Sequence, residues 1–391
     1  MVQPYFHSVT LDTDNCKGCT ICIKRCPTEA IRVRSGKARI LELRCIDCGE
    51  CIRTCPNHAK RAIADEFSLL SKYAYTIALP APSFYGQFSG QEVSISKILQ
   101  SLLTLGFNAV YEVAEAAEHV SLATRRYIEN SSIRPLISSS CPAIVRLIQV
   151  RFPDLIDHLI PIQAPVDVAA RLAKESVMRK HGLRREDIGA FFITPCPAKV
   201  TAIKQPIGLQ TSWVDGAIPI ADVYARVLRT LPYLENTPEL QQASAAGVHW
   251  GRAAGEQDAI KARRHVAVDG IHSVIDVLEE IEIGKFHDID FIECQACRGG
   301  CVGGPLTVQN AFLARINLEN LTRELSNEID PEIIEEVDKR WAMGFYELET
   351  DIEPRSILKL DEDFSKAIEK MELLEKTVES LPGLDCGSCG S

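Results

Sequence analysis

Apolar residues change their spacing along the chain, and this change divides the chain into two regions. After about residue 66, short apolar runs closed by proline or glycine alternate with segments in which apolar side chains recur every three or four positions. The short runs predict buried strands, and the longer spacing predicts helices that bury one face. The expected strands are 74–79, 107–113, 191–194, 265–268 and 288–293, and the expected helices are 95–103, 166–180 and 271–281.

This alternation of strands and helices predicts an α/β domain whose sheets are mostly parallel. In such domains ligands bind beyond the carboxyl ends of the strands. Cys196 and the cysteines of 294–301 follow two of the expected strands, and Cys141 follows the short apolar run 135–137. We therefore expect three distant segments to bring thiols to one face of the domain.

Residues 1–66 have a different pattern, in which the run C-x2-C-x2-C-x3-C-P occurs twice. This is the spacing of bacterial ferredoxins, in which three cysteines of each run hold one 4Fe–4S cluster and the fourth crosses to the other cluster. The pattern predicts one cluster on Cys16, Cys19, Cys22 and Cys55, and a second on Cys45, Cys48, Cys51 and Cys26. Zinc or purely structural thiols are the alternative, but zinc sites are usually built from two separated C-x-x-C pairs.

Composition narrows the class of protein. The 391 residues have a formal net charge of −10, which argues against nucleic-acid binding. No run of 18 or more apolar residues predicts a membrane span, and no signal peptide is recognisable, so we expect a cytoplasmic protein. The 15 cysteines fall in groups with metal-ligand spacing, which favours metal binding over disulfides.

The segment 293–305 combines three cysteines with four glycines. Thiolates bind soft metals, and glycines let the backbone approach a bulky inorganic group closely. The other isolated cysteines lie in Ser138-Ser139-Ser140-Cys141-Pro142 and Thr194-Pro195-Cys196-Pro197-Ala198-Lys199. Together, Cys141, Cys196, Cys297 and Cys301 are suited to holding one iron–sulfur cubane.

These three segments resemble the cluster-binding signatures of the iron-only (FeFe) hydrogenases, and the resemblance covers roughly residues 1–345. It implies an α/β two-lobed catalytic domain behind an α+β ferredoxin-like domain. It also implies an H-cluster, in which a 4Fe–4S cubane is joined to a two-iron subsite with CO, cyanide and azadithiolate. By position, Cys141, Cys196, Cys297 and Cys301 would hold the cubane, and Cys301 would bridge to the subsite. Lys199 matches the lysine that hydrogen-bonds a cyanide ligand, although a solvated surface lysine is the alternative.

The chain departs from that family in its expected proton relay. Ser140 stands where the family usually has a proton-carrying cysteine, and a hydroxyl is a much weaker acid than a thiol. Ile160 takes the place of a relay serine, and 120–127 has no carboxylate where a glutamate pair is expected. We therefore expect the relay to be broken at every aligned step.

Other pocket positions also differ from the family. Thr194 and Gln295 replace methionines and are expected to make the pocket more polar, and Ala202 replaces a glutamate. The glycine run after Cys301 is shortened to Gly303-Gly304. Cys294 is an additional thiol, interpreted as a small buried residue or as a substitute proton carrier.

These departures resemble the sensory branch of the family, in which such a domain precedes a PAS-type sensor and a signalling output. The tail 381–391 resembles the start of a further 4Fe–4S motif, with Cys386 and Cys389. We therefore expect the natural chain to continue, with a downstream PAS, kinase or phosphatase partner. A redox partner such as ferredoxin and maturation proteins are also implied.

Four regions are expected: the ferredoxin-like domain 1–66, the catalytic domain 67–345, a helical segment 346–380 and the tail 381–391. The helical segment contains an amphipathic stripe over 364–378. We expect this helix to dock on the main domain, and a partner or dimer helix is the alternative.

Two functions remain open from the sequence. The first is a slow, hydrogen-sensing hydrogenase that catalyses H2 ⇌ 2H⁺ + 2e⁻ and passes electrons through the two ferredoxin clusters. The second is a non-catalytic electron-transfer or iron–sulfur assembly protein that holds only a 4Fe–4S cubane at the same four cysteines.

Overall fold

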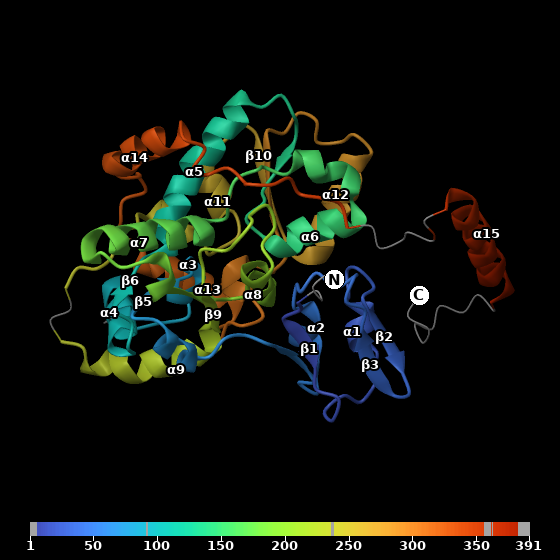
Figure 1. Cartoon of the computed structure of the whole chain (residues 1–391), viewed down its shortest axis with the longest axis horizontal. Helices are drawn as coiled ribbons and strands as arrows, with labels where there is room; N and C mark the ends of the chain where they lie inside the picture. The colour runs from blue at the N-terminus through green and yellow to red at the C-terminus, as the bar shows by residue number, and fades with distance from the viewer. Residues whose placement is uncertain (1–5, 91–92, 236–237, 356–360, 362, 382–391) are drawn as a thin grey trace.

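Two parallel sheets form the centre of the computed structural model, which describes residues 6–90, 93–235, 238–355, 361 and 363–381 (Figure 1). The first sheet has the strand order β6-β5-β8-β9 and the second has the order β10-β11-β7, and all neighbouring strands run parallel. Their bounds are β5 Tyr75–Pro80, β6 Ala109–Val110, β7 Leu136–Ile137, β8 Ile188–Thr194, β9 Gly216–Pro219, β10 His265–Asp269 and β11 Phe291–Gln295. The expected parallel α/β architecture is therefore confirmed.

The central strand β8 illustrates why these segments form strands. All seven of its residues are buried, because helices cover both faces of the sheet. It pairs with β5 from Tyr75↔Ile188 to Pro80↔Ile193, and with β9 up to Thr194↔Pro219. The strands therefore end at one edge of the sheet, and the chain reaches Cys196 directly beyond it.

Helices and short 3-10 turns connect the strands and cover the sheets (Figure 1). The helices are α3 Pro82–Tyr85, α4 Ile95–Thr104, α5 Val113–Asn130, α6 Pro142–Arg151, α7 Pro165–His181, α8 Pro197–Lys204, α9 Ile220–Thr230, α10 Ala245–His249, α11 Gly255–Ile260, α12 Ile271–Glu282, α13 Ala311–Leu321, α14 Pro331–Trp341 and α15 Phe364–Ser380. The 3-10 turns are η1 Phe67–Lys72, η2 Pro153–His158, η3 Arg185–Asp187, η4 Leu231–Tyr233 and η5 Cys301–Gly303. The helices expected at 95–103, 166–180 and 271–281 are confirmed as α4, α7 and α12.

One expected strand is largely wrong. The segment 107–113 forms only the two-residue strand β6, and Val113 already begins α5. The apolar side chains of α5 continue at helical spacing through Ala117 and Val120, and all of these are buried. The longer helical pattern therefore determines the local structure, and the short apolar run does not.

The N-terminal region forms a small separate unit. Its antiparallel pairs are β1 Val9–Leu11 with β4 Lys60–Ala62 and β2 Ile31–Arg34 with β3 Lys37–Ile40, and its helices are α1 Ile21–Lys24 and α2 Glu50–Thr54. Cysteines occupy much of its interior, because Cys16, Cys22 and Cys51 belong to its buried cluster. A unit this small with so few large apolar side chains usually needs metal or disulfides for stability.

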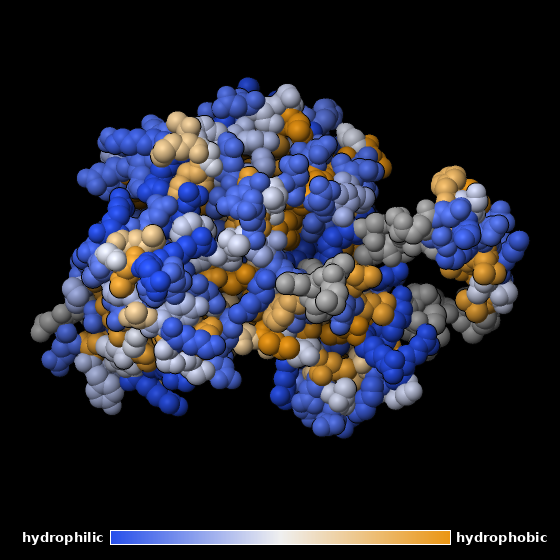
Figure 2. Space-filling view, viewed as in Figure 1, coloured by the Kyte–Doolittle hydropathy of each residue, from blue (hydrophilic) through white to orange (hydrophobic). Residues whose placement is uncertain are grey.

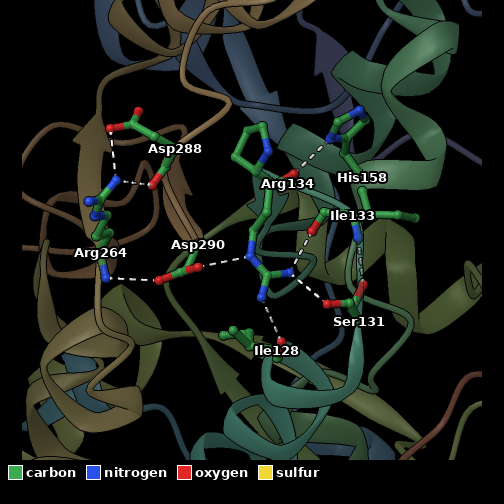
Figure 3. A network of polar contacts seen from close by, with 9 residues as sticks. Ile128, Ser131, Ile133, Arg134, His158, Arg264, Asp288 and Asp290 are labelled. Carbon is green, nitrogen blue, oxygen red and sulfur yellow. Dashed lines mark hydrogen bonds and ion pairs between the residues drawn. The ribbon is translucent and has the colours of Figure 1, made fainter.

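An arginine fixes the start of the second sheet (Figure 3). The guanidinium of Arg134 donates to Asp290 Oδ1 at 2.8 Å and to the backbone oxygens of Ile128, Ser131 and Ile133. Asp290 precedes β11, and Arg134 precedes β7, so this network ties together two strands whose carboxyl ends lead to cysteines.

Helix α15 stands apart from the rest of the protein (Figure 1). None of its residues is buried, and apolar side chains gather on its visible surface (Figure 2). The expectation that this helix docks on the main domain is therefore wrong. Its apolar stripe stays exposed in the described structure.

Candidate metal centre

Four thiols from three segments meet at the carboxyl ends of the strands. Cys141 caps α6 after β7, Cys196 caps α8 after β8, and Cys297 and Cys301 follow β11. All four line one cavity of about 70 Å³, together with Lys199. The convergence expected from the sequence is therefore present in the fold.

The backbone of the loop after β11 comes close to its neighbours because of a glycine. Gly300 has φ +88°, and a Cβ atom there would lie 2.4 Å from the backbone nitrogen of Ala253. Only glycine tolerates both the conformation and the contact. The loop can therefore wrap tightly around the cavity and present Cys297 and Cys301 to it.

The charges around the cavity suit a metal cluster. Burial raises the pKa of Cys196 to about 12 and raises the pKa of Cys301 further. Burial also disfavours the charge of Lys199, but the thiols of Cys301, Cys196 and Cys141 outweigh this effect and raise the pKa of its ammonium group. Thiolates buried to this degree need cationic partners, and iron supplies them.

The residues present fit an H-cluster. Cys141, Cys196, Cys297 and Cys301 would hold its cubane, with Cys301 also next to its two-iron part. Lys199 lines the same cavity and donates from Nζ to the backbone oxygen of Ser140 at 3.1 Å. The buried Oε1 of Gln295, a further wall residue, has no hydrogen-bond partner in the described structure and lies beside Gly300.

The cysteines of the N-terminal unit surround two smaller cavities of about 20 Å³ each. One is lined by Cys16, Cys19, Cys22 and Cys55, and the other by Cys26, Cys45, Cys48 and Cys51. These are the two sets predicted from the repeated run. Each set includes one cysteine of the other run, as the ferredoxin pattern requires.

The second set lies directly against the central cavity. Cys48 also lines that cavity, and Arg53 of the same unit hydrogen-bonds the Cys297 thiol. A Cβ atom on Gly49 would lie 2.4 Å from Cγ of Pro305. A cluster on Cys26, Cys45, Cys48 and Cys51 would therefore be the one nearer to the centre.

A carboxylate that the sequence did not reveal contacts Ser140. The Ser140 hydroxyl donates to Glu256 Oε2 at 2.9 Å, and the Ser138 hydroxyl lies 2.7 and 2.9 Å from the two carboxylate oxygens. Burial raises the pKa of Glu256, and the two serine hydroxyls partly offset this effect. The structure therefore places a carboxylate beside Ser140 at a position outside the aligned relay steps, which remain without their relay groups.

Glu256 does not occupy any of the positions at which the family has its relay residues, and it approaches Ser140 from a different element. A small cavity of about 10 Å³ separates it from Val120, Thr124 and Ile160. Those positions indeed carry no carboxylate. Glu256 is 116 residues away from Ser140 and enters from α11 on the opposite side, so no local pattern could have indicated it.

A second buried carboxylate lies behind Glu256. Glu293 in β11 accepts hydrogen bonds from the backbone nitrogens of Ala254 and Gln257, at 2.9 and 2.8 Å. Burial and the neighbouring Glu256 carboxylate raise the pKa of Glu293. Two acids this close do not ionise independently, so the pair can hold a proton at neutral pH.

Other predicted pocket positions have mixed outcomes. Thr194 was expected to make the pocket more polar, but its hydroxyl instead bonds the backbone of Cys196. Cys294 is completely buried in an apolar cluster and is not among the cavity walls. Ala202 lines a neighbouring cavity of about 60 Å³, where Asp167 supplies a carboxyl group near Lys199. Cys386 and Cys389 lie outside the described residues.

The fold and the site together define an iron–sulfur protein with a thiol-lined centre and a two-cluster N-terminal unit. A family model described as "Iron only hydrogenase large subunit, C-terminal domain" matches residues 74–225 and 222–305, and a "4Fe-4S dicluster domain" model matches residues 8–56. The chain therefore belongs to the iron-only hydrogenase family. The predicted combination of this catalytic fold with a ferredoxin-like dicluster domain is confirmed.

Individual relatives are distant. Iron hydrogenase 1 of Clostridium pasteurianum is 23% identical over 258 residues, which cover 53% of this chain and 44% of the relative. The cytosolic Fe-S cluster assembly factor NAR1 of Yarrowia lipolytica is 24% identical over 106 residues, covering 27% of this chain and 22% of the factor. The chain spans about half the length of the hydrogenases that it matches.

The fold also resembles a solved structure. A variant of FeFe-hydrogenase HydA1 from Chlamydomonas reinhardtii superposes with a TM-score of 0.55 at 14% identity, covering 74% of this chain and 99% of that one. Among the described residues, no helix combines the length and the apolar character that crossing a membrane requires.

Proposed function

We propose that the chain interconverts H2 with protons and electrons at its central cavity. The observation that carries this proposal is the convergence of Cys141, Cys196, Cys297 and Cys301 with Lys199 around one cavity. When bound there, the H-cluster would supply the redox chemistry of H2. The chain would hold it through the four thiolates and would place the Lys199 ammonium against its anionic ligands, which is a strong, charge-assisted contact.

Electrons would pass through the N-terminal unit in a fixed order. The set Cys26, Cys45, Cys48 and Cys51 borders the central cavity through Cys48, so its cluster would exchange electrons with the centre directly. The set Cys16, Cys19, Cys22 and Cys55 would hold the outer cluster. A redox partner such as a ferredoxin would then exchange electrons with that outer cluster.

Protons would enter and leave through Ser140 and Glu256. Ser140 borders the cavity and its hydroxyl donates to Glu256 at 2.9 Å, which supports this route. A hydroxyl is a poor proton donor compared with a thiol, and a well-matched acid–base group typically contributes a factor of about 10²–10⁴. We therefore propose slow turnover.

Slow turnover suits a hydrogen sensor, whose signal depends on the redox state of the centre and not on flux. In this proposal the chain reports H2 to a downstream signalling domain or protein, such as a PAS, kinase or phosphatase module. The H-cluster would be installed by maturation proteins.

The substitution Ser140→Cys tests the proton route. A thiol at this position should raise H2 turnover by about 10-fold or more, because it exchanges protons far more readily than a hydroxyl at neutral pH. Ser139→Cys is the matched control, because the Ser139 hydroxyl donates to the backbone oxygen of Ile162 instead. Unchanged turnover in Ser140→Cys would instead place the limiting step elsewhere, for example at Ile160.

A second candidate function is iron–sulfur assembly or electron transfer with a cubane alone, favoured by the partial match to the assembly factor. Infrared spectra of the matured protein separate the two. Bands of iron-bound CO and cyanide are expected for the hydrogenase. Their absence after full maturation, with a cubane present by electron paramagnetic resonance, would favour the second function.

A further inference from the structure

Helix α15 carries a heptad repeat. Its apolar side chains recur at alternating steps of three and four residues. The first core positions are Phe364, Met371 and Val378, and the second are Ala367, Leu374 and Leu381, just beyond the helix end. This spacing is typical of a helix that packs along another helix in a coiled coil.

This core stripe is open to solvent. The exposed fractions of Phe364, Met371, Leu374 and Val378 are 79%, 54%, 56% and 59%. A single helix of 17 residues is only marginally stable in water, and most helical stability in proteins comes from packing an apolar face. The stripe is therefore unpaired in the described structure, and packing it against another apolar surface would stabilise the helix.

We propose that a second copy of this chain covers the stripe, with the two α15 helices forming a parallel two-stranded coiled coil. The charges beside the core favour this arrangement. In a parallel pair, Lys370 lies opposite Glu375 of the second copy, and this opposite-charge contact occurs twice. In an antiparallel pair with the same core layers, Lys370 would face Thr377 and Glu375 would face Ile368 of the second copy, so neither charge would gain an opposite partner.

The local environment of Lys370 is compatible with this pairing. Its Nζ lies 2.8 Å from Asp361 Oδ2 of its own chain, on an exposed part of the helix. In the dimer the ammonium would lie between that carboxylate and Glu375 of the second copy. The proposal does not depend on the reaction at the metal centre.

The first test measures the oligomeric state of the whole, cluster-loaded chain by analytical ultracentrifugation. We expect a monomer–dimer equilibrium between about 1 and 100 µM, since small interfaces bind weakly. Leu374→Lys should weaken dimerisation at least about 10-fold, because it places a charge in the core. Leu373→Lys is the matched control: Leu373 is equally apolar and 64% exposed, but it lies off the stripe.

The second test distinguishes parallel from antiparallel pairing of the two α15 helices. Lys370→Glu and Glu375→Lys should each weaken the dimer by creating two like-charge contacts, and the double variant should restore it. In antiparallel pairing neither position faces a charged residue of the second copy, so either reversal should leave the dimer unchanged. Single variants that dimerise as well as the unmodified chain would therefore contradict the parallel arrangement.

Three further outcomes would overturn the proposal. The chain could remain monomeric at about 100 µM, the upper end of the range in which such an interface should form. A dimer could form that Leu374→Lys and Leu373→Lys affect equally. Hydrogen exchange could instead show that α15 of a monomer protects its own main domain. Iron content should be unchanged in all variants, because α15 stands away from the clusters.

Discussion

At the scale of single residues, the contact between Ser140 and Glu256 carries the proposed proton route. Ser140 borders the cavity, Glu256 lies behind it, and Glu293 lies behind Glu256. Glu256 and Glu293 are buried away from bulk water, whereas Ser140 is half-buried. Burial keeps the carboxyl groups protonated at a higher pH than usual, so they can store a proton for transfer.

Glu256→Gln should lower H2 turnover by about 10²-fold in both directions, because an amide of the same size cannot take up or release the proton. The control is Glu118→Gln. Glu118 is also a buried glutamate with a pKa raised to about 7 by burial, but it accepts from the backbone nitrogen of Ser244. Equal losses in the two variants would argue for a general effect on folding. Infrared spectra should confirm that both variants carry the same centre.

Asp167 gives a prediction about stability and pH. Burial raises its pKa to about 6, and Lys199 partly offsets that effect. A raised carboxyl pKa favours the folded state below the unfolded pKa, and this contribution is lost as pH rises through the folded value.

Asp167→Asn should therefore gain stability relative to the unmodified chain as pH rises from 5 to 7, by about 1 kcal/mol. Thermal or denaturant unfolding of both cluster-loaded proteins at several pH values measures this difference. A difference that stays constant over this range would show that Asp167 titrates normally. The wild-type carboxyl would then be well solvated in the folded chain.

At the scale of elements, the metal centre depends on strand ends and on the loops that follow them. β7, β8 and β11 each lead into a cysteine, and the Arg134 network ties β7 to β11 (Figure 3). The loop after β11 is the most constrained of these, because Gly300 lies against Ala253 with a positive φ.

Gly300→Ala should prevent the loop from closing around the centre, because the new Cβ would overlap the Ala253 backbone. We expect loss of the central cluster with retention of both N-terminal clusters, measured by iron content and electron paramagnetic resonance. Gly284→Ala is the control: Gly284 has φ +83°, but a Cβ atom there would meet no neighbouring atom within 4 Å. Both variants carry the backbone strain of alanine at positive φ, so a difference between them isolates the steric contact. Full retention of the central cluster in Gly300→Ala would contradict this account.

At the scale of the whole molecule, the N-terminal unit must be docked for electrons to reach the centre. The contact runs through Cys48, Gly49 and Arg53 on one side and through Cys297 and Pro305 on the other. A close fit at Gly49 keeps the inner cluster next to the cavity.

Gly49→Ala should loosen this contact, because its Cβ would lie 2.4 Å from Pro305 Cγ. We expect about 10-fold slower reduction of the centre by an external donor, measured by rapid mixing, with all clusters still present; this corresponds to about 1.4 kcal/mol. Gly36→Ala is the control in the same unit, since Gly36 has φ +73° and no neighbour within 4 Å. Equal rates in the two variants would show that the contact does not govern electron transfer.

How much of the fold and of the metal centre could be predicted depends on how far apart in the sequence the interacting residues lie. The two cysteine runs and the strand ends that carry Cys141, Cys196, Cys297 and Cys301 were visible because ligand spacing and hydrophobic period are local properties. The short β6 and the start of α5 were missed because two local patterns competed over the same residues. The undocked α15 was missed because an amphipathic stripe does not specify what it packs against.

The sequence by itself determined the two cluster-binding runs, the parallel α/β architecture and the four thiols of the centre, because covalent spacing and periodicity encode them. Only the tertiary structure decided that Glu256 stands beside Ser140, that Cys48 borders the central cavity, and that Thr194 turns its hydroxyl to the backbone. These contacts depend on how distant elements pack and on which way each side chain points. The contacts that support the proposed proton route and the proposed order of the clusters are therefore properties of the folded chain.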